Sequence, residues 1–345
     1  MKTIYRTKNF KGATAVAILD TEIKDKPIYI IKYDDSLKLL DTAHKKTYSV
    51  DDPVYCKNIL LSPNGLYFVP AKTAYDTEEQ IYTTIDLTLF RKVDSKDLCK
   101  DGGYFVDGTF GADGTLYFLI QTKTDAIYQH IYSYDIPTGK IETVYETDEK
   151  IADIIRWDEE LGGLLAINRK SGVKVIKDGS IAYDVNTGSY SFILYSEKLG
   201  GFVYDSPRGI KITGLDSKPV KQVDFIPSKT LDRDELGDDE LGKRITHANQ
   251  YASTAVLNVR CKERFVGMEK SLDYLFILTE EIIDQYFTLY VLSLDTLTVD
   301  QTKTFIEGKY IGLDAFDYNL ALFTTKGCEV YTCLVQNFYQ DEEDY

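Results

Sequence analysis

The sequence contains few of the residues that form disulfide frameworks or metal centres. Its five cysteines are odd in number and widely spaced, and none forms a Cys-x-x-Cys pair: Cys56, Cys99, Cys261, Cys328 and Cys333. The three histidines also lie far apart, at His44, His130 and His247. Disulfide scaffolds and zinc sites need closely repeated ligands. We therefore expect free thiols, no metal site and no cofactor.

Long apolar runs are missing as well. No stretch approaches the roughly 20 apolar residues that cross a bilayer. The N-terminal residues Met1–Arg6 do not form a signal peptide, and the apolar run Ala13–Leu19 ends at Asp20 and fits a strand. These absences predict a cytoplasmic protein that is not embedded in a membrane, unless it is exported without a cleavable signal.

Positive charge is in deficit. Lys and Arg total 40 against 55 Asp and Glu, so the formal net charge is −15. Binding to nucleic-acid phosphates or to anionic lipids needs a basic footprint, and none dominates here. The charge favours protein partners with a basic surface. The alternative is that it only keeps the protein soluble.

Catalytic signatures are also absent. There is no Gly-x-Ser-x-Gly elbow and no phosphate-binding Gly-x-x-x-x-Gly-Lys loop. Residues 232–237 begin like a calcium loop, but Leu236 and Lys243 occupy two positions where ligands are required. We predict that the chain is not an enzyme and has no catalytic residues.

Strand-forming residues are plentiful, with 27 Tyr and 16 Phe. An apolar strand that ends in Asp recurs along the chain, at Asp41, Asp86, Asp135 and Asp295. We assign these carboxylates to turn hydrogen bonds. Gly-containing hairpin turns recur between the strands, as in Arg169-Lys170-Ser171-Gly172 and Pro207-Arg208-Gly209.

Together these signals define a repeated four-stranded meander. One meander cannot bury both of its faces, whereas meanders stacked around an axis can. The prediction is an all-β, single-domain, closed β-propeller over residues 1–345 with four-stranded antiparallel blades. Seven blades are preferred, and six or eight remain open. Either Lys2–Thr7 or Cys333–Phe338 could supply the closing strand.

The repeat resembles divergent WD40-like propellers in its period, in the Ser62-Pro63-Asn64-Gly65 turn and in the Asp that ends the third strand. The Trp-Asp and Gly-His pairs of that family are absent at the matching positions, and Trp157 lies in a first strand. The resemblance implies a protein-binding scaffold and points to no particular member.

Two acidic segments interrupt or follow the repeat, a polar insertion at about 227–250 and a tail at 340–345. The insertion contains a near-tandem Glu-Leu-Gly. Leu236 and Leu241 are its candidate partner-binding residues, and a flexible loop is the alternative.

Turns between second and third strands lie on the same face of a propeller as the connections between blades. Four candidate partner-binding residues lie in such turns, namely Arg169, Lys170, Arg208 and Lys326. The corresponding turns of two other blades are acidic, with Asp76, Glu78, Glu79, Glu280, Glu281 and Asp284. This pattern predicts a charge-divided face for protein recognition. Alternatively, exposed hairpins are simply charged.

The predicted function is a non-catalytic interaction scaffold that acts as one subunit of a larger assembly and binds neither nucleic acid nor membrane. The alternative is a propeller enzyme or small-ligand binder that uses the central channel. A scaffold should expose a patch of aromatic and Arg residues on one face. An enzyme should instead have an axial pocket in which polar groups converge.

Overall fold

The computed structural model describes most of the chain between residues 2 and 332. The described residues are 2–7, 13, 15–19, 28–33, 36–41, 44–50, 58–62, 67–71, 81–86, 91–97, 103–122, 128–226, 263–281, 287–304, 310–316 and 319–332. The insertion at 227–250 and the tail at 340–345 lie outside these ranges.

The described strands form seven four-stranded antiparallel sheets, so the predicted all-β class and four-stranded antiparallel meander are confirmed. The first three sheets are β2 (Ala15–Leu19), β3 (Ile28–Lys32), β4 (Leu37–Asp41) and β5 (Lys46–Val50); β6 (Asn58–Leu61), β7 (Tyr67–Ala71), β8 (Ile81–Asp86) and β9 (Arg91–Asp97); and β10 (Gly103–Phe110), β11 (Leu116–Thr122), β12 (Gln129–Asp135) and β13 (Lys140–Thr147).

The next three sheets follow the same order. They are β14 (Ile154–Asp158), β15 (Gly163–Asn168), β16 (Gly172–Lys177) and β17 (Ser180–Asn186); β18 (Ile193–Ser196), β19 (Gly201–Ser206), β20 (Gly209–Thr213) and β21 (Pro219–Asp224); and β22 (Glu263–Ser271), β23 (Tyr274–Glu281), β24 (Phe287–Ser293) and β25 (Val299–Thr304).

The last sheet joins the two ends of the described chain. It contains β26 (Tyr310–Phe316), β27 (Asn319–Thr324) and β28 (Gly327–Thr332), and β1 (Lys2–Thr7) pairs antiparallel with β28. Of the two candidate closing strands named from the sequence, Lys2–Thr7 is the one that pairs with β28, and Cys333–Phe338 lies outside the described residues. This pairing covers the outer edge of β28, which would otherwise present unpaired backbone groups.

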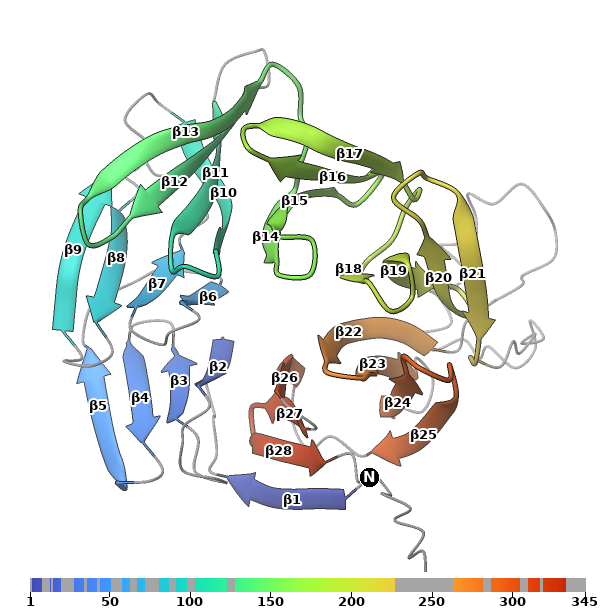
Figure 1. Cartoon of the computed structure of the whole chain (residues 1–345). Helices are drawn as coiled ribbons and strands as arrows, with labels where there is room; N and C mark the ends of the chain where they lie inside the picture. The colour runs from blue at the N-terminus through green and yellow to red at the C-terminus, as the bar shows by residue number, and fades with distance from the viewer. Residues whose placement is uncertain are drawn as a thin grey trace, which may run out of the picture.

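The sheets stand around a common axis in a propeller arrangement (Figure 1). The first strand of each meander lies nearest the axis and the fourth lies at the rim (Figure 1). Because neighbouring sheets cover both faces of the middle strands, these strands are almost continuously apolar. Side chains of β15 and β19 are nearly all buried, whereas those of the rim strands β17 and β21 are mostly exposed.

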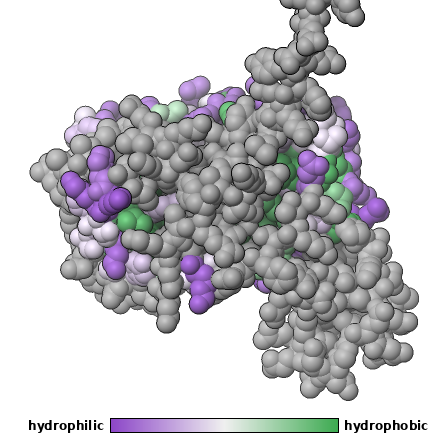
Figure 2. Space-filling model, turned by 90° about the horizontal axis from the view of Figure 1, so that it is seen from below, coloured by the Kyte–Doolittle hydropathy of each residue, from purple (hydrophilic) through white to green (hydrophobic). Residues whose placement is uncertain are grey.

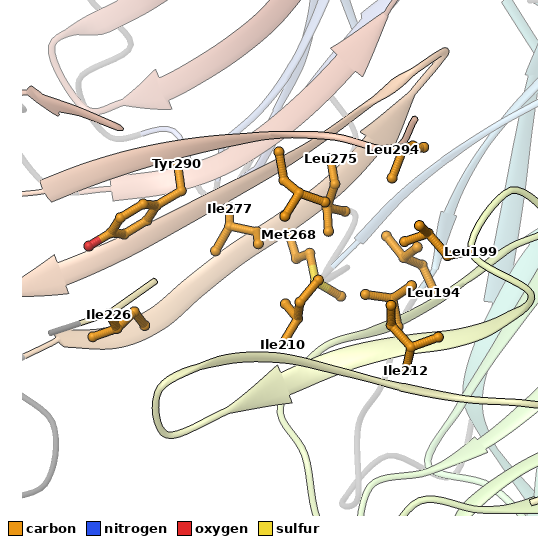
Figure 3. Close-up of a cluster of buried hydrophobic side chains, with 12 residues drawn as sticks. Leu194, Leu199, Ile210, Ile212, Ile226, Met268, Leu275, Ile277, Tyr290 and Leu294 are labelled. Atoms are coloured by element: carbon orange, nitrogen blue, oxygen red, sulfur yellow. The ribbon is translucent and has the colours of Figure 1, made fainter. Parts of the chain in front are cut away.

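The core consists of apolar layers between adjacent sheets. The layer between the sheets of β18–β21 and β22–β25 is drawn in Figure 3, where Ile210 and Ile212 face Met268, Leu275 and Ile277. All five side chains are buried, and each buried aliphatic side chain contributes roughly 1.5–3 kcal/mol to folding. Seen from the side in Figure 2, the coloured surface is mainly hydrophilic, with small hydrophobic patches.

The Asp residues that end third strands do not all act alike. Asp41 Oδ1 accepts the N–H of His44 at 3.0 Å, and Asp135 Oδ1 accepts the N–H of Thr138 at 3.4 Å, as expected for turn residues. Asp86 ends β8, and its side chain lies outside the description. Asp295 differs, because its carboxylate binds Lys198 of the preceding sheet at 2.8 Å.

Candidate interaction site

Arg169 and Lys170 lie at the tip of the tight turn between β15 and β16. The turn is fixed at its base, where Asn168 Oδ1 accepts the N–H of Lys170 at 3.1 Å. Asp153 Oδ2 accepts the N–H of Arg169 at 3.4 Å. Both side chains are exposed, and within the described part of the chain neither forms an ion pair. The turn therefore presents two adjacent cations on an ordered backbone.

Tyr190 also holds this turn in place, through hydrogen bonds to its backbone. Its hydroxyl donates to the carbonyl of Asn168 at 3.1 Å and lies 3.0 Å from the carbonyl of Gly172, while its N–H donates to the carbonyl of Arg169. Burial raises the pKa of Tyr190 far above its usual value, so the hydroxyl keeps its proton and remains a donor. The side chain of Tyr190 is buried. Movement of the turn would break these buried hydrogen bonds.

Arg208 occupies the equivalent turn of the adjacent sheet, between β19 and β20. Its carbonyl accepts the N–H groups of Phe225 and Ile226, both at 2.9 Å. Its guanidinium already binds the carboxylate of Asp224 at 2.9 Å. The charge of Arg208 is thus partly neutralised, in contrast to the charges of Arg169 and Lys170.

The remaining predicted partner-binding residues do not join this group. Lys326 is exposed in the turn between β27 and β28, on the far side of the ring from β15 and β16 (Figure 1). Leu236 and Leu241 lie outside the described residues. Arg169, Lys170 and Arg208 lie in equivalent turns of neighbouring sheets.

Most of the acidic turn residues that were expected to divide the face are also outside the description, namely Asp76, Glu78, Glu79 and Asp284. Glu280 is described, and its carboxylate binds Arg264 at 2.5 Å, which cancels its charge locally. Glu281 ends β23 and its side chain is not described.

A second group of charges lies at the opposite ends of these strands. Lys270 of β22 donates to Glu160 Oε1 at 2.8 Å and to the carbonyl of Tyr195 at 2.8 Å. The other oxygen of Glu160 accepts the N–H of Glu197 at 2.8 Å. These contacts join three successive sheets, because Glu160 follows β14, Tyr195 is in β18 and Lys270 is in β22.

Lys198 makes a parallel connection between two sheets. Its ammonium binds Asp273, in the turn between β22 and β23, and Asp295, in the turn after β24. These two hydrogen bonds raise the pKa of Lys198 well above its usual value, although the group is exposed. The bridge therefore stays charged at neutral pH.

Two acidic groups near the axis have raised pKa values. Burial raises the pKa of Asp158, whose Oδ1 accepts the N–H of Leu161 at 2.9 Å. Burial also raises the pKa of Glu269, and Arg156, 4.0 Å away, opposes the shift. These groups lie on the inner strands β14 and β22.

Metal binding and membrane insertion find no support in the described part of the chain. Within it, no three His, Cys, Asp or Glu side chains are grouped so that they could hold a metal ion. No described helix is long and apolar enough to cross a membrane.

The sequence interpretation missed the contacts that join sheets. Glu160 and Lys270 are 110 positions apart, and Lys198 and Asp273 are 75 apart. No local pattern pairs residues at such separations. A weak signal was present in Asp273 and Asp295, because both occupy turns of the same meander.

Comparison with known proteins supports the fold and no more. No protein-family model matches the chain, and no curated protein matches it. Among solved structures, hydrazine synthase from Kuenenia stuttgartiensis matches with a TM-score of 0.61 at 11% identity, over 96% of this chain and 98% of that one. A computationally designed protein, Ika8, matches with a TM-score of 0.52 at 9% identity, over 94% of this chain and 98% of that one. At such identities the likeness concerns architecture alone: this is an all-β protein with four-stranded antiparallel sheets in a propeller arrangement.

Proposed function

We propose that the protein is a non-catalytic interaction scaffold, a cytoplasmic, WD40-like propeller of seven blades in a closed ring, and one subunit of a larger assembly. The observation that carries this proposal is the pair Arg169 and Lys170. They are two exposed cations without ion-pair partners in the described part of the chain, held on a rigid turn of a strongly acidic protein.

The physical argument concerns orientation. The net charge of −15 attracts a protein partner with a basic surface from a distance. Arg169 and Lys170 repel basic groups locally and attract acidic ones, so they fix how such a partner settles. Because the turn is held by Asn168, Asp153 and Tyr190, little conformational entropy is lost when the partner binds.

A second candidate function, a small-ligand binder or enzyme at the axis, has one supporting observation. Asp158 and Glu269 lie on inner strands and have raised pKa values, a property that is enriched at functional sites. A ligand at this position would protect the protein thermally, and Asp158→Asn with Glu269→Gln would abolish that protection. The scaffold proposal predicts equal binding of protein partners by this double variant and the parent.

The test is affinity purification of the tagged protein from its native cell, followed by mass spectrometry. We expect a protein partner in stoichiometric amount with the parent, and its loss with Arg169→Glu/Lys170→Glu. The matched control is Lys211→Glu/Lys221→Glu, which makes the same charge change at exposed positions of β20 and β21. Equal partner recovery by both double variants would contradict the proposal.

A further inference from the structure

Two leucines of the described chain, Leu272 and Leu297, lie in turns with a positive φ, and Leu272 is the exposed one of the two. Leu272 is the first of the two residues that connect β22 to β23, and 52% of its surface is exposed. Its φ is +50°, in the left-handed region where a side chain with a β-carbon costs free energy. Leu272 therefore gains little from burial while its backbone is strained.

The corresponding turns of the three preceding sheets do not carry this strain. Between their first and second strands they place glycine in the same left-handed region, namely Gly114 at φ +84°, Gly162 at φ +57° and Gly200 at φ +73°. Glycine adopts such angles without steric cost. Leu272 is thus a departure from the pattern of the repeat, and strained residues of this kind concentrate at functional sites.

The backbone around Leu272 is held in place. The carbonyl of Asp273 accepts the N–H of Leu294 at 2.8 Å, and its carboxylate binds Lys198. Tyr274, which begins β23, pairs with Ser271 at the end of β22. The Leu272 side chain is consequently presented to solvent on a fixed hairpin, as expected of an anchor that is pre-organised for binding.

The charge beside this hairpin is acidic. Asp273 and Asp295 share the single ammonium of Lys198, and the neighbouring Glu197 is exposed. Three carboxylates and one ammonium leave a local formal charge of −2. An apolar projection with such a border is complementary to an apolar pocket surrounded by Lys or Arg.

From these observations we propose that Leu272 is the apolar anchor of a second interaction surface, and that its partner is a protein with an apolar pocket bordered by basic side chains. The inference rests on the proposed scaffold function and adds a separate surface to it. The turn of Arg169 and Lys170 joins a second strand to a third, whereas the turn of Leu272 joins a first strand to a second, so the two turns lie at opposite ends of their strands. A six-residue strand such as β15 is about 20 Å long.

The first experiment identifies what contacts Leu272. A leucine-sized diazirine amino acid is placed at position 272, the protein is irradiated in its native cell, and the crosslinked peptide is identified by mass spectrometry. We expect a peptide from another protein that contains apolar residues flanked by Lys or Arg. Crosslinks to a second copy of this chain, to lipid, or to nothing would each overturn the proposal.

The second experiment separates binding from folding. Leu272→Gly removes the anchor and relieves the backbone strain, so we expect a melting temperature about 2 °C higher. We also expect that affinity purification of this variant no longer recovers the partner that the crosslink identified. The control is Lys45→Gly at φ +55°, which relieves similar strain at an exposed polar position and should leave binding unchanged. Retention of the partner by Leu272→Gly would contradict the proposal.

The two proposals fail in distinguishable ways. If Arg169→Glu/Lys170→Glu retains its partner while Leu272→Gly loses one, only the charged surface is wrong. If the charge reversal removes a partner and Leu272→Gly has no effect on any bound protein, the anchor is wrong and the scaffold function stands.

Discussion

Lys270 of β22 donates to Glu160 across an intervening sheet, at a distance of 2.8 Å between Nζ and Oε1. Both side chains are largely withdrawn from water, with 21% and 35% of their surfaces exposed. The same ammonium also satisfies the carbonyl of Tyr195 in that intervening sheet. The Lys270 side chain therefore connects three successive sheets.

Substitution Lys270→Met should remove this connection while keeping the length of the side chain. We expect the free energy of unfolding to fall by about 2 kcal/mol, because Glu160 and the Tyr195 carbonyl lose a charged donor. Urea denaturation measures the change. Lys218→Met is the control, since Lys218 is 81% exposed in its pair with Asp216 and its replacement should leave stability nearly unchanged. Equal effects would show that the three-sheet contact does not stabilise the fold.

Gln129 should be among the least replaceable polar residues of the described chain. Its side chain is 1% exposed, its Nε2 donates to the carbonyl of Ala152 at 2.8 Å, and its Oε1 accepts the N–H groups of Ile151 and Ala152. Gln129→Leu leaves these buried backbone groups unpaired, and we expect a loss of about 3 kcal/mol in urea denaturation. Gln222→Leu, on the exposed strand β21, should change stability by less than about 0.5 kcal/mol. A small loss for both would contradict the assigned role.

Asp158 should make stability depend on pH. Because burial raises its pKa in the folded state, its favourable contribution is present below the unfolded pKa, about 3.9, and is lost as pH rises through the folded pKa. Asp158→Asn stays neutral and keeps an acceptor for the Leu161 N–H. We expect this variant to gain stability relative to the parent as pH rises from about 3 to 7.

Asp216 supplies a control of opposite sign for the same titration. Hydrogen bonds from Lys218 lower its pKa, so its contribution is present above the unfolded pKa and is lost as pH falls. Asp216→Asn should therefore lose stability relative to the parent as pH rises over the same range. The stability of each variant relative to the parent is measured by urea denaturation across this pH range. If it changes in the same direction for both variants, burial is excluded as the cause of the raised pKa of Asp158.

Gly172 should tolerate no side chain. Its φ is +148°, and an added β-carbon would lie 2.0 Å from the carbonyl oxygen of Val185. We expect Gly172→Ala to lower the free energy of unfolding by about 3 kcal/mol. Gly162→Ala is the matched control, because its φ is +57° and no atom lies within 4 Å of the added carbon. Its cost should be only about 1 kcal/mol in the same urea denaturation experiment.

Local signals in the sequence were sufficient to predict the strands. The hairpin turn at Arg169 and Lys170 and the Asp that ends β12 are encoded within a few residues, because turn geometry restricts which residues fit. The alternation of turns and apolar segments was likewise enough to predict four-stranded meanders. A sheet whose two faces are both apolar then packs against a neighbouring sheet on each side.

Contacts between sheets could not be predicted in this way. The pairing of β1 with β28 joins residues more than 300 positions apart, and the sequence left two strands as equal candidates for it. Asp295 looks like Asp41 and Asp135 in sequence, yet it binds Lys198 instead of its own turn. Leu272 resembles an ordinary strand residue until its left-handed backbone is known.

The central claim is that this protein works by binding another protein through an oriented surface. Native mass spectrometry of the tagged protein, isolated gently from its native cell, tests it most directly. We expect the parent in a complex of fixed stoichiometry with a different protein, and the Arg169→Glu/Lys170→Glu variant without that protein. The parent found only at its own mass, or a complex of unchanged stoichiometry with the variant, would contradict the claim.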